Sequence, residues 1–283
     1  MGKKGKKAQA GKPKKLTPKD VGKRMDALVR KLGVELKGAD LFAPLPPTED
    51  CAICLVPLSH FNSQTGHQTC CGNSICKGCL LENRESIQKQ KDAGKKVDFT
   101  CPFCREPDPT SNQELLRRLQ ARCLENDHEA FTVMGSFYRG DRGAIVPKDD
   151  LKALDCFIRA VELGSPHACI CIADACNEGK GVAVDKERAI LFERVGALRG
   201  DVAARHNIGV SELKLGNYEF AIRHWKIAAE AGLQSSLDEL TISYNMPGKD
   251  FITKEYLDFA YRACHEAQME VESEERKKHF GTK

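Results

Sequence analysis

Eight of the fourteen cysteines lie between residues 51 and 104, where they form four close pairs. Three pairs have two residues between the cysteines and one pair is adjacent: Cys51 and Cys54, Cys70 and Cys71, Cys76 and Cys79, Cys101 and Cys104. A Cys-x2-Cys pair on a tight turn directs two thiolates at one ion, and two such pairs complete the tetrahedron that zinc prefers. The spacing therefore predicts two structural zinc ions. Four sulfurs around each ion would leave no open position for metal-assisted hydrolysis.

The cysteines also bear on the compartment. The lysines of residues 1–15 are not followed by an apolar segment, so no signal peptide is expected, and no run of 18 apolar residues predicts a membrane span. We therefore expect an intracellular protein, cytoplasmic or nuclear, whose thiols are reduced. The other six cysteines follow helical patterns and are expected to be packed or surface thiols: Cys123, Cys156, Cys169, Cys171, Cys176 and Cys264.

The basic character of the chain belongs to its first residues. Residues 1–15 hold seven lysines and no acid, whereas the net charge of the whole chain is only +4. We expect residues 1–20 to be a basic, disordered tail. Nucleic-acid binding would rest on this tail alone and is not expected.

Helical signals appear on both sides of the cysteine region. Apolar residues at helical spacing predict a short helix over residues 21–32, and proline then predicts an extended linker within residues 21–50. After the cysteine region of residues 51–105, Thr110 or Ser111 can cap a connecting helix within residues 106–126.

From residue 127 onward the sequence repeats itself with a period of 32 to 38 residues. The four units are 127–164, 165–200, 201–232 and 233–268. Short side chains recur at one position in the first half of each unit: Gly135, Ala173, Gly209 and Thr241. Two helices per unit at this period predict an all-α solenoid of helix-turn-helix repeats over residues 127–268. Residues 269–283 are expected to form a charged C-terminal tail.

The units resemble Sel-one-like repeats, which are related to tetratricopeptide repeats, through segments such as "NEGKGVAVDKERAI" and "AIRHWKIAAEAG". The resemblance covers about half of the chain and implies a right-handed superhelix whose concave face binds another protein. The second unit departs from its siblings by placing Glu193 where they have Phe157, Trp225 and Tyr261. The neighbouring Phe192 is expected to fill that space.

The cysteine region resembles a RING-type zinc finger through "CAICLVPL", "CGNSICKGC" and "CPFCR". In that family the ligand pairs alternate between two ions. The resemblance implies a first site made of Cys51, Cys54, Cys76 and Cys79. It gives Cys101 and Cys104 to a second site, which takes two more ligands from residues 70–73. The expected fold class is a small zinc-stabilised α+β RING-like domain followed by the solenoid.

The second site departs from the usual pattern, because Asn73 stands where the family has a histidine ligand. A neutral amide is a poor zinc ligand beside a thiolate. We therefore predict that Cys70 and Cys71 both bind the second ion, with Asn73, His60 and His67 as the alternatives. His60 and His67 do not lie at a ligand spacing, and both are expected to be exposed loop residues.

The RING resemblance implies a ubiquitin ligase without a covalent intermediate, which positions a charged ubiquitin-conjugating enzyme while the helical repeats bind a protein substrate. Ile53 and Pro102 would form the apolar platform for that enzyme, and Arg105 would bridge ubiquitin and the enzyme. The alternative is a non-catalytic protein-interaction scaffold with a structural two-zinc domain. The sequence specifies neither the conjugating enzyme nor the partner on the repeats.

Overall fold

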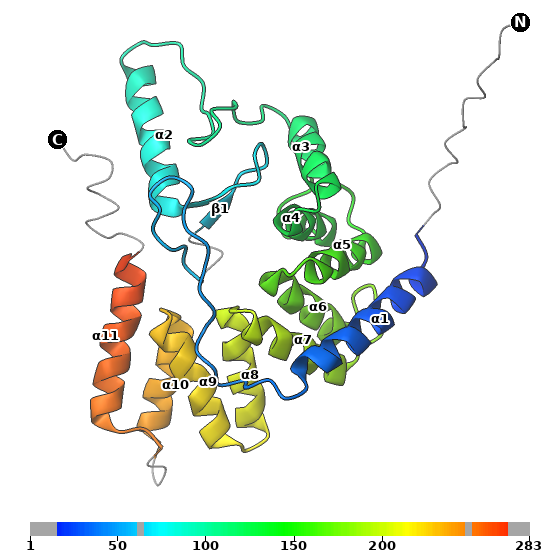
Figure 1. Ribbon diagram of the computed structural model, residues 1–283, viewed down its shortest axis with the longest axis vertical. Coiled ribbons are helices and arrows are strands. Elements are labelled where there is room, and N and C mark those ends of the chain that lie inside the picture. The colour runs from blue at the N-terminus through cyan, green and yellow to red at the C-terminus, as the bar shows by residue number, and fades with distance from the viewer. Residues whose placement is uncertain (1–15, 61–64, 247–250, 271–283) are drawn as a thin grey trace, which may run out of the picture.

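The computed structural model describes residues 16–60, 65–246 and 251–270, which form eleven helices and one two-stranded sheet. The predicted tails therefore lie largely outside the described residues, at positions 1–15 and 271–283. In Figure 1 the helices from α4 to α11 follow one another around an arc, and the part of the chain that carries β1 and α2 lies across the open side of that arc.

The cysteine region contains little regular structure. Strand β1 (Thr65–His67) pairs antiparallel with β2 (Ser74–Cys76), so that Gly66 lies opposite Ile75. Helix α2 (Lys77–Asp92) follows β2 directly. Helix α3 (Asn112–Leu124) then leads into the repeats, and its N-cap Ser111 accepts a hydrogen bond from the Glu114 N–H at 3.2 Å, as predicted.

Each of the four predicted units contains two helices. In chain order these are α4 (His128–Arg139), α5 (Asp150–Glu162), α6 (Pro166–Glu178), α7 (Lys186–Leu198), α8 (Val202–Lys214), α9 (Tyr218–Glu230), α10 (Gln234–Tyr244) and α11 (Lys254–Glu270). Consecutive helices pack against each other along the arc. The turn glycines Gly164, Gly200 and Gly232 have φ angles of 104°, 97° and 97°, which favours glycine at the end of a helix.

In three of the four units the short residue of the first helix contacts the aromatic residue of the second. A Cβ atom at Gly135 would lie 2.4 Å from the ring of Phe157, and one at Gly209 would lie 2.4 Å from the indole of Trp225. These glycines let the two helices approach closely, and their rings are fully buried. The repeat pattern thus records a packing requirement inside each unit.

The second unit replaces this aromatic residue with a buried acid. Phe192 is fully buried, as expected, but Glu193 is also only 7% exposed. Burial raises the pKa of the Glu193 carboxyl to about 7, and the negative charge of Asp174 adds to the increase. The folded protein therefore holds a proton on this carboxyl at a higher pH than an exposed glutamate does.

Helix α1 (Pro18–Leu36) is longer than the predicted segment 21–32, because Thr17 caps it and Pro18 suits its first turn. Its buried side chains pack on the second helices of the first two units, α5 and α7. Ion pairs fix its polar side, including Arg24 with Asp155 and Glu35 with Arg199. Among the described residues, no helix has the length and apolar character that crossing a bilayer requires.

Replacing Glu193 with glutamine should change how stability depends on pH. Because folding raises the pKa of this carboxyl from 4.5 to about 7, the free energy of unfolding should fall as pH rises through that range. Glutamine does not ionise, so its advantage over glutamate should grow by about 2 kcal/mol between pH 5 and pH 8. Denaturant unfolding followed by the fluorescence of Trp225, the single tryptophan, measures this difference.

The exposed Glu266 of α11 provides the control, since its replacement by glutamine removes the same charge from solvent. An equal pH dependence in the Glu193→Gln chain and the wild type would contradict the prediction.

Candidate metal centre

Two segments of the cysteine region, residues 51–57 and 101–107, adopt the same turn. In each segment the backbone N–H of the first cysteine donates to a carbonyl five residues later, at 2.9 Å. The residues that follow the second cysteine are Leu55 and Arg105, and both have positive φ angles, of 56° and 63°. Each segment also closes with a bridge to a proline, Pro57 or Pro107. The turn brings both sulfurs of its Cys-x2-Cys pair into one group.

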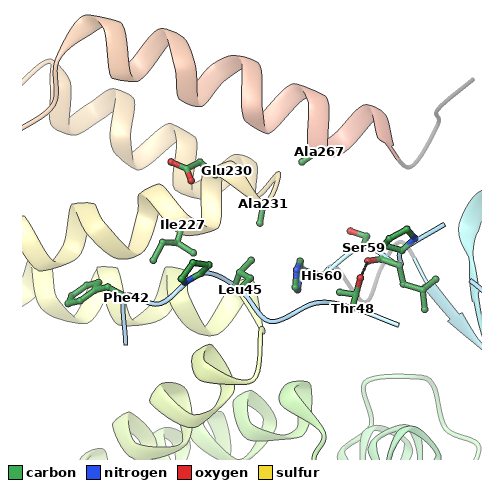
Figure 2. Close-up of a pocket in the computed structure, with 12 residues that line it drawn as sticks. Phe42, Leu45, Thr48, Ser59, His60, Ile227, Glu230, Ala231 and Ala267 are labelled. Carbon is green, nitrogen blue, oxygen red and sulfur yellow. Dashed lines mark hydrogen bonds between the residues drawn. The ribbon is translucent and has the colours of Figure 1, made fainter. Parts of the chain in front are cut away.

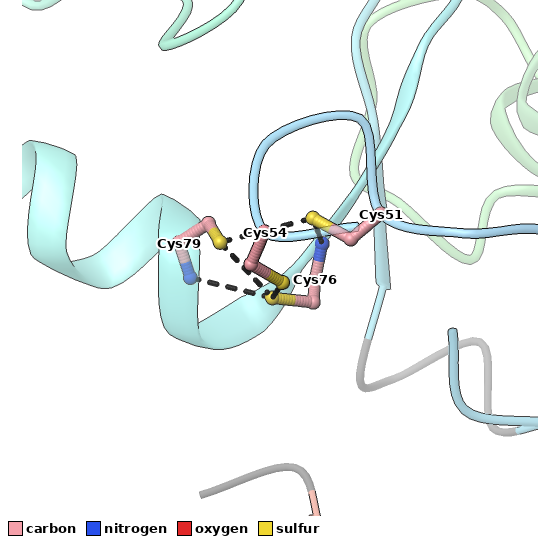
Figure 3. A group of neighbouring side chains, drawn as sticks. All are labelled: Cys51, Cys54, Cys76 and Cys79. Atoms are coloured by element: carbon pink, nitrogen blue, oxygen red, sulfur yellow. Dashed lines mark hydrogen bonds between the residues drawn. The ribbon is translucent and has the colours of Figure 1, made fainter. Parts of the chain in front are cut away.

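The first group contains the sulfurs of Cys51, Cys54, Cys76 and Cys79, all within 4.8 Å of one another (Figure 3). The Sγ atoms of Cys51 and Cys79 are 3.7 Å apart, and those of Cys54 and Cys76 are 3.9 Å apart. With zinc–sulfur bonds of about 2.3 Å, the sulfurs of an ideal tetrahedron lie about 3.8 Å apart. The group therefore has the dimensions of a zinc site, and its separations are far too long for disulfide bonds of about 2.05 Å.

Backbone donors stabilise negative charge on these sulfurs. The Cys76 N–H points at the Cys51 sulfur, with the nitrogen 3.3 Å away, and the Cys79 N–H points at the Cys76 sulfur at 3.5 Å. Cys76 is also the N-cap of α2, where the helix dipole favours an anion. All four cysteines are buried, so the site is closed to solvent.

Because the four thiols lie close together, they shift one another's pKa values in opposite directions. Hydrogen bonds from the side chains of Cys76 and Cys79 lower the pKa of Cys51 far below its ordinary value. The interaction with Cys51 raises the pKa of Cys76 and of Cys79. One thiolate thus opposes ionisation of its neighbours, and a bound cation would remove that opposition.

The second group contains the sulfurs of Cys70, Cys71, Cys101 and Cys104, again within 4.8 Å of one another. The Sγ atoms of Cys104 and Cys70 are 3.4 Å apart, and those of Cys71 and Cys101 are 3.9 Å apart. Cys101 is buried and Cys104 is exposed, so this group is more open than the first. The two groups take alternate cysteine pairs along the chain. Each group offers four thiolates, which are soft ligands of the kind that zinc binds. That both groups bind zinc remains a prediction.

Neither cysteine group includes His60 or His67. Asn73 accepts a hydrogen bond from the Gln68 N–H at 3.0 Å through its backbone carbonyl. His60 is half-buried and lies against Gly200, and His67 lies on β1 with a side chain that is only 9% exposed. The expectation that both histidines occupy exposed loops is therefore wrong.

His67 connects the cysteine region to the repeats. Its Nε2 atom lies 3.0 Å from Oδ2 of Asp127, the N-cap of α4. Arg122 of α3 donates to the same carboxylate at 2.9 Å. On the same helix, Arg118 donates to the Pro107 carbonyl at 2.8 Å. No pattern in the sequence predicted these contacts between distant segments.

The three residues of the implied platform are accessible. Ile53 and Pro102 are half-buried and Arg105 is exposed. Two further apolar side chains of the turns, Leu55 and Phe103, are also exposed, although their types alone predicted burial. The two turns therefore present an apolar surface outside the cysteine groups.

No protein-family model and no curated protein matches this sequence. Among solved structures, the chain is similar to a Sel1 repeat protein from Oxalobacter formigenes, with 23% identity, a TM-score of 0.47, and coverage of 67% of this chain and 73% of that one. It is also similar to a protective antigen of uropathogenic Escherichia coli with an SLR fold, with 18% identity and a TM-score of 0.49. That match covers 68% of this chain but only 43% of the other.

Replacing Cys70 with serine should reduce the bound zinc from two ions per chain to one, because the second group then offers three sulfurs. Replacing Asn73 with alanine should leave two ions bound, because four sulfurs already complete the second group. Metal analysis after gel filtration gives the count. Cys123→Ser removes a thiol outside both groups and serves as the control. Loss of an ion from the Asn73→Ala chain would show that the ligand assignment is wrong.

Proposed function

We propose that the protein is a protein-interaction scaffold in which two zinc ions hold a small RING-like domain against a solenoid of helical repeats. The observation that carries this proposal is the closure of both cysteine groups. Four sulfurs around each ion leave no position for a substrate or a reactive water, so the metal would fix shape rather than perform chemistry. The function then lies in the surfaces of the two parts.

The domain limits of this scaffold are part of the proposal. Residues 51–105 form the zinc domain, residues 106–126 connect it to the repeats, and residues 127–268 form four Sel-one-like repeats. Zinc-bound thiolates persist in a reducing compartment, so we place the protein inside the cell. The repeats would bind a protein partner along their extended surface.

The contacts of α3 support a fixed relation between the two parts. Arg118 reaches the zinc domain through the Pro107 carbonyl, and its Nη2 atom lies 3.5 Å from the Glu106 carboxylate. The Arg118 side chain is only 11% exposed, so it is held between the two parts. A scaffold that presents two partners at a fixed distance requires such a joint.

A ubiquitin ligase is the second candidate. The cysteine groups take alternate pairs, as the RING resemblance implies, and Ile53, Pro102 and Arg105 remain accessible to a conjugating enzyme. A ligase of this kind works by positioning a charged enzyme and not by acid–base chemistry at zinc. The same surfaces would serve both functions, so activity must be measured.

Replacing Arg118 with alanine should loosen the joint. We expect faster amide hydrogen exchange over residues 100–109, because the Pro107 carbonyl loses its donor. Arg117→Ala is the matched control, since Arg117 also pairs with Glu114 but is 69% exposed. Equal exchange in the two variants would contradict a role of Arg118 in the joint.

The two candidate functions differ in ubiquitin discharge from a panel of charged conjugating enzymes. For a scaffold we expect no acceleration by the chain with two zinc ions bound. Acceleration that is lost on Ile53→Ala or Arg105→Ala would instead establish the ligase and its active face. Zinc content measured on the same samples shows that each variant keeps its folded domain.

A further inference from the structure

Residues 40–46 cross the repeats without helix or strand structure, between α1 and the zinc domain, and we call them the strap (Figure 1). Arg205 of α8 holds the strap by its backbone. Its guanidinium donates one hydrogen bond to the Leu41 carbonyl at 2.5 Å and another to the Ala43 carbonyl at 3.0 Å. Arg205 is only 1% exposed. The donors of a buried arginine need acceptors, and the backbone of the strap provides two of them.

The Phe42 side chain of the strap contacts two rings and one arginine of α9. The Arg223 guanidinium lies 3.5 Å from the ring centroid of Phe42. The Phe42 ring is also 4.8 Å from His224 and 5.7 Å from Phe220, measured between ring centroids. Contacts of this kind recognise an aromatic residue and not a chain of arbitrary sequence.

The strap is folded to present this ring. The Asp40 carboxylate accepts a hydrogen bond from the Phe42 N–H at 2.9 Å, which forms a tight turn of the Asp-x-Phe sequence. The negative charge of Asp40 also acts on Arg205. Asp40 therefore contributes both the shape of the turn and the charge that complements the site.

The helices around Phe42 provide an excess of positive charge. Arg194, Arg205 and Arg223 come from α7, α8 and α9, and the charges of all three act on His224. Burial and these three charges lower the pKa of His224 to about 4, so the ring is neutral at physiological pH. The site thus favours an acidic segment over a neutral or basic one.

Space for a larger ligand remains beside the strap. A hollow of about 570 Å³ lies between Leu45 of the strap, Ile227 and Ala231 of α9, and Ala267 of α11 (Figure 2). At the C-terminal end of the strap, Pro46 packs on Gly200. A segment that follows the strap's course could therefore place additional apolar side chains in this hollow.

We propose that the surface formed by Arg205, Phe220, Arg223 and His224 is a docking site for a short segment with an acidic residue two positions before a phenylalanine, in a partner protein. The strap is the occupant of this site within the chain, and the partner segment binds by taking its place. This inference rests on the proposed scaffold function and names the chemistry of one partner.

The strap competes from within the chain. It is tethered on both sides, so its effective concentration at the site is on the order of millimolar or more. A free segment of the same sequence should therefore bind poorly to the wild type, and weakening the strap should expose the site.

The test uses a fluorescent peptide of residues 38–47 and the full chain with zinc bound. We expect the peptide to bind the Phe42→Ala chain at least tenfold more tightly than the wild type. Adding Arg223→Glu to that chain should abolish binding, because it reverses the charge of an exposed residue under the ring. A peptide carrying Phe42→Ala should not bind. Fluorescence anisotropy measures all four combinations.

Equal binding to the wild type and the Phe42→Ala chain would overturn the proposal, and so would binding that survives Arg223→Glu. If the Phe42→Ala chain loses zinc or its native Trp225 fluorescence, Asp40→Asn replaces it, since that change weakens the turn and removes the complementary charge but keeps the Phe42 ring. The result concerns this site alone, because zinc content and ubiquitin discharge test the proposed function separately.

Discussion

The contact between His67 and Asp127 joins three parts of the molecule. Asp127 caps α4 through the N–H groups of Glu129 and Ala130, receives a hydrogen bond from Arg122 of α3, and contacts His67 of the zinc domain. Burial would raise the pKa of this carboxyl, but His67 and Arg122 lower it well below its ordinary range. The carboxylate therefore stays charged, and the first helix of the repeats begins where the zinc domain is attached.

The cysteine region has few apolar side chains to stabilise it. Its buried cluster consists of five cysteines with Leu58 and Ile75, so the sulfurs replace the apolar side chains of an ordinary core. Without metal, such a cluster would leave thiols crowded together with little apolar area to bury. The repeats are different, since their cores are continuous across neighbouring helices and include large rings such as Phe157 and Phe192. Folding of the two parts thus depends on different forces.

The sequence predicted well what is determined locally. The repeat period predicted the paired helices of each unit, and Ser111, one of two candidate caps, begins α3. The cysteines that the family pattern assigned to each site lie together in the structure, and zinc binding by the two groups stays a prediction. In each case the signal comes from residues a few positions apart or from a repeated pattern.

Contacts between distant segments left no such signal. The strap and Arg205 are more than 160 residues apart, and His67 was interpreted as an exposed loop residue because nothing near it in sequence indicated a partner. Glu193 breaks the aromatic pattern of its unit, yet its burial could not be predicted, because charged side chains are usually exposed.

These distant contacts explain how a small zinc domain can be held in one orientation. It is attached through the strap on its N-terminal side and through α3 on its C-terminal side. A segment joined at one end could rotate about that end, whereas two attachments on different helices restrict rotation. If a partner displaced the strap, the attachment through α3 and Asp127 and the contact of His60 with Gly200 would remain. Binding at the repeats would then change the freedom of the zinc domain without any change at its cysteines, which couples the two surfaces through the strap.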